Sequence, residues 1–233
     1  MKISNSSFIN KIFFYNSIFF LANLIFFLIF PKIDITISSF FFYKGTFIHN
    51  HFPFISELRT FLKNLMVFIG FTSLLYLISL KINSLQKILI IKKKVRSKLI
   101  AFGLLFGPLV GCGLIANLYF KDSWGRARPY QIEEFGGKLI YSAPLIKSNQ
   151  CSKNCSWIGG ETSAAFSFIA GILFLKRRIF FFKIICMFGF FVIFCRMAMG
   201  GHFLSDNLFA INIMIYLSLI YYFTLIKFIK KTK

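Results

Sequence analysis

The sequence predicts an all-α membrane protein with six transmembrane helices. Of its 233 residues, 57% are hydrophobic and 20% are aromatic, which is more apolar surface than a soluble domain of this length carries. The apolar runs are long enough for membrane-spanning helices rather than barrel strands. No polar segment is long enough for a separate soluble domain, so residues 1–233 are expected to form a single membrane domain.

The expected helices are apolar runs that charged or polar segments separate. The runs are residues 12–30, 64–80, 99–120, 162–175, 179–196 and 206–226. The first lacks a small-residue cleavage site, so it is expected to be a retained signal anchor. The third is rich in Gly and Ala, which suits close helix packing. The fourth is short for a span, and its helix is expected to begin near Gly159.

The charges predict which side of the membrane each loop faces. With six spans, both termini lie on one side, and most of the 28 Lys and Arg fall on that side, which is therefore cytoplasmic by the positive-inside rule. The opposite, outward side carries all seven acidic residues, which are Asp34, Glu57, Asp122, Glu133, Glu134, Glu161 and Asp206.

The net charge of +21 would suit a nucleic-acid-binding protein. The basic residues, however, cluster at the ends of apolar runs, as membrane topology requires. We therefore expect the lipid bilayer as the partner and no nucleic acid, and nothing in the sequence implies a protein partner.

Cysteine and histidine give little support to a metal or cofactor. His49 and His51 form a His-x-His pair, but no Asp, Glu or Cys stands close enough to complete a site, so residues 32–63 are expected to be an interfacial amphipathic segment. Cys151 and Cys155 share a polar loop and could form a disulfide if the loop faces an oxidising compartment, with free thiols as the alternative. The other cysteines, Cys112, Cys186 and Cys195, are expected to be packing residues.

Two segments on the outward side suit an anion. Lys121, Arg126 and Arg128 lie within eight residues, and planar arginines match phosphate, although a basic loop on lipid head groups is the alternative. Gly160 lies at a Gly-Gly helix start, where free backbone N–H groups can bind anions. Glu161 follows as either a helix cap or a proton donor.

A third segment carries Arg196, His202 and Asp206. Arg196 presents a fork of donors to an oxyanion, His202 is a candidate nucleophile or proton carrier, and Asp206, four residues on, could hold the imidazole. The alternative is a snorkelling arginine beside a His and an Asp that cap the helix. With the first two segments it predicts phosphoryl transfer without a metal.

These residues carry a resemblance to a known family. Their order and spacing resemble the three-part signature of the type 2 phosphatidic acid phosphatase superfamily, over about residues 105–210 and with a motif-bearing core at about 99–226. The signature here is Lys121-x6-Arg128-Pro129, then the Gly-rich helix start, then Arg196-x5-His202-x3-Asp206. Two residue patterns resemble those of the lipid A phosphatases, especially the 4′-phosphatase group. They are Lys-Asp-x-Trp-Gly-Arg-x-Arg-Pro in the first segment and Cys-x-x-Asn-Cys-Ser before the second.

The resemblance implies a role for each site residue. Lys121, Arg128 and Arg196 would bind phosphate, His202 would form a phosphohistidine, and Asp206 would polarise it. The family usually has Pro-Ser-Gly-His in the second segment, where this chain has Ile158-Gly159-Gly160-Glu161. Glu161 is therefore expected to replace the histidine that protonates the leaving oxygen.

The expected function is hydrolysis of a phosphate monoester of lipid A, the 4′-phosphate favoured, by a metal-independent enzyme without cofactors. The active site would face the periplasm from the bacterial inner membrane. The alternative substrates are phosphatidylglycerophosphate, phosphatidate or an isoprenyl diphosphate. A third hypothesis is an inactive lipid-binding relative, which the altered second segment favours and the intact first and third segments oppose.

Overall fold

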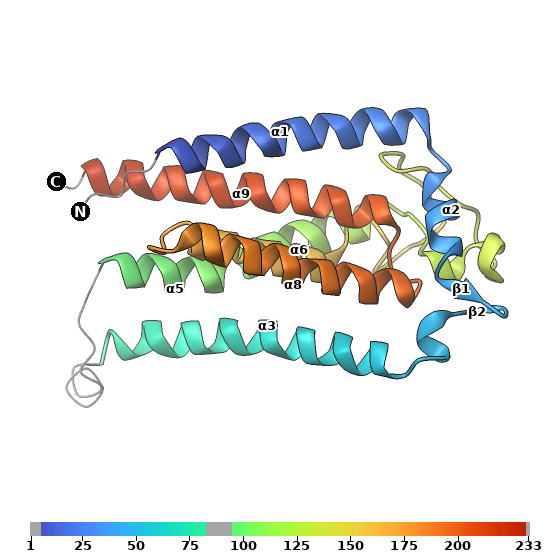
Figure 1. Ribbon diagram of the computed structural model, residues 1–233, viewed down its shortest axis with the longest axis horizontal. Helices are drawn as coiled ribbons and strands as arrows, with labels where there is room; N and C mark the ends of the chain where they lie inside the picture. Colours follow the sequence, from blue (N-terminus) through green and yellow to red (C-terminus); the bar gives the residue numbers. More distant parts are fainter. Residues whose placement is uncertain (1–5, 83–94, 232–233) are drawn as a thin grey trace.

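A computed structural model describes residues 6–82 and 95–231. The helices run back and forth along one long axis, and the longer described connections gather at one end (Figure 1). In the described part of the chain, five helices are long and apolar enough to cross a membrane. They are α1 (Ser6–Ile29), α3 (Phe54–Ser79), α5 (Val95–Pro108) continued by the π-helix η2 (Leu109–Lys121), α8 (Arg178–Ala198) and α9 (Leu204–Lys231).

The fourth expected span is built differently from the others. It consists of two short helices, α6 (Gly160–Ser167) and α7 (Ile169–Ile172), so its start near Gly159 is confirmed. The two helices lie in the middle of the bundle, where α6 packs against α8, α9 and η2. Nearly every side chain of this segment is buried in protein, whereas the outer helices expose many large apolar side chains, as lipid-facing helices do.

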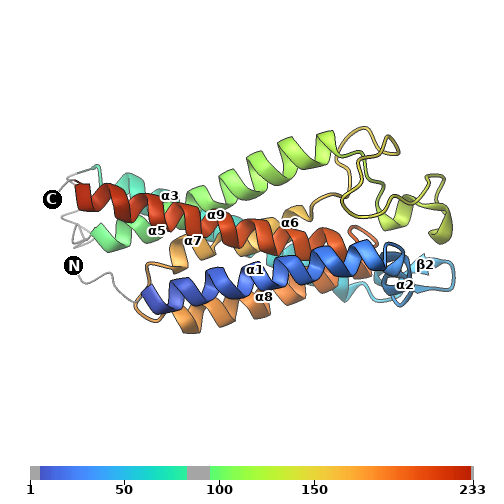
Figure 2. The ribbon, with the colours of Figure 1, turned by 90° about the horizontal axis from the view of Figure 1, so that it is seen from above.

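Polar side chains join the first and last helices, which lie side by side (Figures 1 and 2). Asn23 Nδ2 on α1 donates to Asn212 Oδ1 on α9 over 2.9 Å. Asn212 Nδ2 donates in turn to Asn16 Oδ1 over 3.1 Å. All three side chains are buried, and such amide pairs hold neighbouring helices together inside a membrane.

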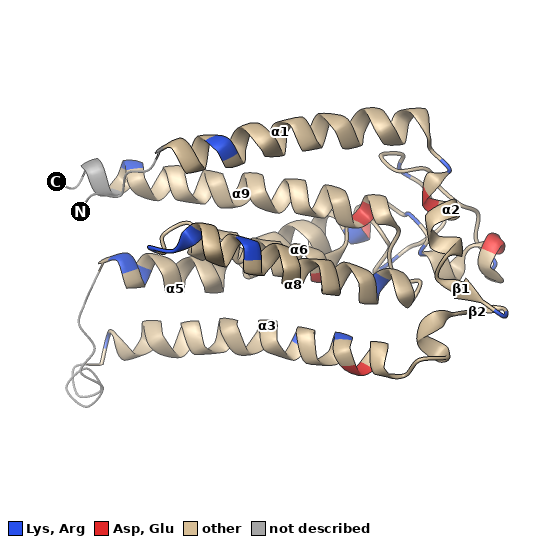
Figure 3. Cartoon of the chain, viewed as in Figure 1, with Lys and Arg blue, Asp and Glu red and all other residues tan. Residues whose placement is uncertain are grey.

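Short elements make up the loop end of the bundle. They are α2 (Ile33–Ser39), β1 (Phe42–Tyr43), β2 (Thr46–Phe47), η1 (Ile48–Asn50), η3 (Pro129–Gln131) and η4 (Glu133–Phe135). The acidic residues also gather toward this end, away from the beginning of α1 and the end of α9 (Figure 3). Residues 83–94, part of the basic segment 81–98 that contributed to the predicted topology, lie outside the described residues.

Two expectations for residues 32–63 are wrong. α3 begins at Phe54 and not at residue 64, because Glu57, Arg59 and Lys63 lower the hydropathy of turns that are nevertheless helical. The segment before it is not one amphipathic stretch but α2 followed by a β-hairpin in which Tyr43 pairs with Thr46. His51 fixes this hairpin, since its Nε2 lies 2.9 Å from Thr46 Oγ1.

Candidate active site

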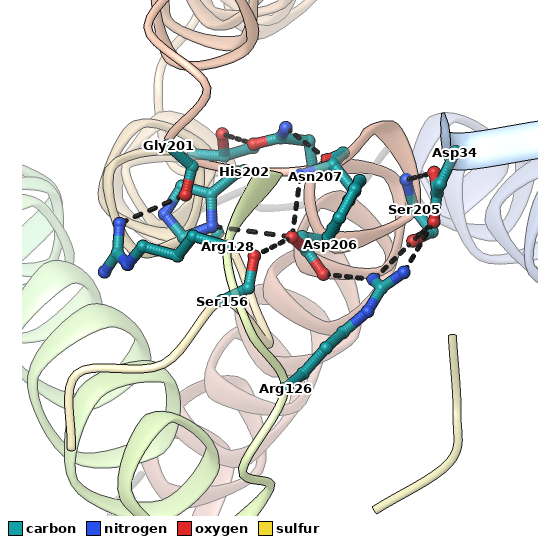
Figure 4. A network of polar contacts seen from close by, with 12 residues as sticks. Asp34, Arg126, Arg128, Ser156, Gly201, His202, Ser205, Asp206 and Asn207 are labelled. Atoms are coloured by element: carbon teal, nitrogen blue, oxygen red, sulfur yellow. Dashed lines mark hydrogen bonds and ion pairs between the residues drawn. The ribbon is translucent and has the colours of Figure 1, made fainter. Parts of the chain in front are cut away.

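The first and third segments singled out in the sequence meet around His202 at the loop end of the bundle (Figure 4), and Glu161 of the second segment lies 3.7 Å from Arg196 of the third. His202 lies in the turn between α8 and α9, and 1% of its side chain is exposed. Its Nδ1 faces Asp206 on the first turn of α9, with 3.6 Å between Nδ1 and Oδ2. This distance exceeds a hydrogen bond, and Nδ1 has no other partner among the described residues.

Asp206 is held from three directions. Its Oδ1 accepts from Arg126 Nη1 over 2.6 Å, and its Oδ2 accepts from the backbone N–H of Phe203 over 2.8 Å and from the hydroxyl of Ser156. The carboxylate is fully buried. It is therefore fixed behind the imidazole as an anion whose charge Arg126 balances.

Arg126 does not face the phosphate site, although the sequence groups it with Lys121 and Arg128. Its guanidinium is fully buried between Asp206 and Asp34 of α2, 2.8 Å from Asp34 Oδ2. Burial alone would lower the pKa of Arg126, but the charges of Asp206 and Asp34 outweigh it and raise this pKa. Arg126 is thus a permanent cation that joins α2 to the His202 turn.

Arg128 is held by the loop that contains the disulfide. Its Nε and Nη2 donate to the backbone oxygen of Asn154 over 3.0 and 2.8 Å, and its Nη1 donates to Gly201 O over 3.1 Å. Asn154 lies between Cys151 and Cys155, whose sulfur atoms are bonded. The bridged loop therefore sets the position of the Arg128 side chain beside His202 (Figure 4).

Lys121, at the end of η2, lies against the start of α6. A Cβ atom on Gly160 would come within 2.7 Å of Lys121 Nζ. A side chain at this position would push the ammonium aside from this helix start, where backbone N–H groups also favour an anion.

Arg196 and Glu161 lie on the other side of the site. Arg196 Nη1 is 3.7 Å from Glu161 Oε1, and its buried Nε has no hydrogen-bond partner in the described ranges. A buried guanidinium with an unused donor is suited to an oxyanion ligand. Glu161 therefore lies next to the candidate phosphate site, as the second segment predicts.

Arg59 on α3 is a site residue that the sequence analysis missed. Its Nε donates to both carboxylate oxygens of Glu161, over 3.0 and 3.1 Å, and its Nη2 donates to Oε1. The sequence offered one signal for this role. Arg59 is a cation among apolar residues, and cations in membrane segments commonly pair with a partner inside the protein.

Electrostatics keep His202 neutral. Burial is the largest effect on the pKa of His202, and the charges of Arg128, Arg196 and Lys121 act in the same direction, while Asp206 opposes them. Together they lower this pKa well below its ordinary value of 6.5. A neutral imidazole keeps the lone pair that a nucleophile needs, and the three cations are placed to stabilise an incoming phosphate.

Comparison with known proteins identifies the family of this chain. The model of the PAP2 superfamily matches residues 98–229, which include all three segments of the candidate site. The chain belongs to the PAP2 superfamily. Membership places it among phosphatases, and no solved structure matches it significantly.

Several relatives of this PAP2 protein are named lipid A 4′-phosphatase. The protein of that name from Francisella tularensis subsp. novicida is 34% identical over 199 residues, which cover 83% of this chain and 86% of the relative. Those from Rhizobium etli and Rhizobium leguminosarum are each 30% identical over 100 residues, which cover 42% of this chain and 39% and 43% of the relatives.

Proposed function

We propose that this protein hydrolyses a phosphate monoester of lipid A, with the 4′-phosphate favoured, at the periplasmic face of a bacterial inner membrane. The observation that carries the proposal is the buried, neutral His202 with Asp206 behind it and Lys121, Arg128 and Arg196 around it. The substrate assignment is supported by the relative from Francisella, which aligns with most of the chain.

The reaction proceeds in two steps. Nε2 of His202, the nitrogen remote from Asp206, attacks phosphorus, and the bond from phosphorus to the sugar oxygen breaks as that oxygen takes a proton. Asp206 stabilises the positive charge that develops on the imidazole. Water then attacks the phosphohistidine, the P–N bond breaks, and inorganic phosphate leaves with His202 restored. The three cations stabilise the phosphoryl charge in both steps, and no metal takes part.

Glu161 is the proposed proton carrier for the leaving oxygen. In the described structure it is paired with Arg59 and lies near Arg196. Glu161 would protonate the sugar oxygen in the first step and accept a proton from water in the second.

The topology is part of the proposal. Six passes, with α6 and α7 as the fourth, put the beginning of α1 and the end of α9 in the cytoplasm and the His202 turn in the periplasm. The sequence places most of the 28 Lys and Arg on the side of the two ends, and this excess supports the orientation by the positive-inside rule. The acidic residues gather at the opposite, loop end (Figure 3). Accessibility of single cysteines introduced at Lys44 and Lys138 to an impermeant thiol reagent tests it in intact inner-membrane vesicles of known orientation.

Mass analysis of lipid A from cells with and without the gene tests the function. We expect loss of one phosphate only when the wild-type gene is present, and no loss with His202→Ala. Purified protein is then assayed on lipid A species that carry only the 1- or only the 4′-phosphate, with and without a chelator, which we expect to have no effect. Unchanged lipid A, together with phosphate release from phosphatidate or an isoprenyl diphosphate, would assign a different substrate.

A further inference from the structure

A cavity of about 410 Å³ lies beside the candidate active site, at the loop end of the bundle. Its walls include four aromatic rings, those of Phe42, Phe47, Tyr130 and Phe135. Its polar groups come from Thr46, His49 and Asn50, and Met199 completes the side next to α8. The volume lies within the range of about 300–1,000 Å³ that is usual for small-molecule sites.

The cavity lies next to two of the three proposed phosphate ligands, Arg128 and Arg196. Met199 follows Arg196 by three residues at the end of α8, and residues three apart lie on one helix face about 5–6 Å apart. Tyr130 follows Arg128 by two residues, and its backbone N–H donates to Gly200 O over 3.1 Å. A group covalently attached to a phosphate at His202 is therefore within reach of the cavity.

The wall of the cavity is packed firmly against the His202 turn. Gly200 adopts a positive φ of 62°, and a side chain there would overlap the ring of Phe47. Phe47 and Phe135 belong to a small buried cluster that also contains Phe203, the residue after His202. The position of the cavity relative to the candidate nucleophile is thus fixed by packing.

The chemistry of the cavity suits a sugar ring. A pyranose has two faces of C–H groups, which pack on aromatic rings, and an edge of hydroxyls, which need hydrogen-bond partners. Thr46, His49 and Asn50 add polar side chains to the lining, with which the hydroxyl edge can pair. An acyl chain would leave these polar groups without partners, and a metal ion would find no carboxylate in the lining.

We propose that this cavity binds the pyranose ring that carries the scissile phosphate. The inference rests on the proposed function, since lipid A is a glycolipid whose phosphates are attached to sugar rings. The phosphate lies on Lys121, Arg128 and Arg196, and the ring lies between the aromatic walls with its hydroxyl edge toward His49 and Asn50. The cavity therefore selects phosphorylated glycolipids over glycerol-based phospholipids.

Kinetics of the purified full-length protein in detergent test this site. The variants are Tyr130→Ala and His49→Ala, and the control is Tyr43→Ala, which removes an exposed ring from the same hairpin outside the cavity. We expect each cavity variant to raise KM for lipid A 4′-monophosphate about tenfold, the effect of losing one good contact. The inhibition constant of inorganic phosphate, which has no ring, should stay within about twofold of wild type by the same scale.

Three outcomes separate the possibilities. Unchanged KM in both cavity variants, with lipid A hydrolysed by the wild type, overturns the sugar site and leaves the proposed function intact. An equal rise in KM and in the inhibition constant of phosphate also overturns it, because the residues would then act only by supporting the phosphate site. Absence of lipid A hydrolysis by a wild type that releases phosphate from phosphatidate sinks the proposed function, and the sugar site with it.

Discussion

Arg59 on α3 and Glu161 at the start of α6 form an ion pair across 102 residues of sequence, with both carboxylate oxygens bound. The pair lies at the edge of the site, where 28% of the Arg59 side chain and 19% of the Glu161 side chain remain exposed. With Glu161 paired in this way, its Oε1 lies 3.7 Å from Arg196 Nη1, which is beyond hydrogen-bond distance.

Removing Arg59 should therefore weaken substrate binding. In Arg59→Gln, Glu161 loses its main partner and pairs with Arg196, so that it competes with the substrate phosphate. We expect KM to rise about tenfold, roughly 1.4 kcal/mol, and Glu161→Gln in the same protein to bring KM back toward wild type while kcat stays low. The control is Lys63→Gln, which removes an exposed cation one turn further along α3. A KM that the double variant does not recover would contradict the competition.

Arg126 should matter for stability more than for phosphate binding. Arg126→Met leaves the buried carboxylates of Asp34 and Asp206 without their cation, and loss of one partner of a buried ion pair costs about 3–5 kcal/mol. We expect a large drop in the temperature at which the detergent-solubilised protein loses monodispersity. Adding Asp34→Asn should recover part of the loss, because one uncompensated charge is removed.

The matched control is Lys153→Met, which removes an exposed cation from the bridged loop. This variant should melt at the same temperature as wild type. If Arg126→Met also melts like wild type while its KM rises, Arg126 contacts substrate and its assignment as a buried structural cation is wrong.

The pH profile should reflect the lowered pKa of His202. A neutral imidazole is needed for attack, and this pKa lies below 6.5 in the folded protein, so the imidazole stays neutral as the pH falls past 6.5. We expect the acid limb of kcat/KM to lie below pH 6.5. Arg128→Gln removes one of the charges that lower this pKa, and its acid limb should move to higher pH. The same substrate is used for both proteins, so its own titration cancels in the comparison.

The lowered pKa of His202 should also make the stability of the fold depend on pH. Below about pH 6.5 the unfolded state takes up a proton on His202 that the folded state does not bind, so folding is weakened as the pH falls. His202→Gln should flatten this dependence. An unchanged slope between pH 6.5 and pH 5 would mean that other groups dominate it.

The disulfide should support phosphate binding through Arg128. Cys151→Ser with Cys155→Ser frees the loop around Asn154, whose oxygen atoms accept from Arg128. We expect KM to rise about threefold to tenfold, within the range of one weakened hydrogen bond to a charged group, with kcat nearly unchanged. A reductant should produce the same rise in wild type and have no effect on the double variant. An effect of the reductant on the double variant would point to one of the other cysteines.

The sequence predicts the parts of the site whose partners are near in the chain or belong to a known motif. His202 and Asp206 are four residues apart, and Lys121, Arg128 and Arg196 follow the family spacing; the structure brings all five together. Hydropathy locates the long helices, but it places the start of α3 too late because charged residues occupy the first turns of that helix.

The remaining parts depend on contacts that spacing does not reveal. Asp34 meets Arg126 across 92 residues, and Arg59 meets Glu161 across 102. Whether a basic residue faces a phosphate or a buried carboxylate depends on which helix lies opposite. Residue chemistry alone therefore could not separate Arg126 from Arg128, and only the family spacing selected Arg128.

The short central segment α6–α7 has a consequence for how the protein is made. Gly160 to Ile172 spans about 20 Å at 1.5 Å per residue, less than the roughly 30 Å of hydrocarbon in a bilayer. Its hydroxyl groups are satisfied by neighbours, as when Thr162 donates to Asn207 Oδ1 on α9 over 2.6 Å. The segment is thus poorly suited to enter the membrane alone during synthesis. It should settle only when α9 has emerged from the ribosome, so that the phosphate site is completed only after α9 has been translated.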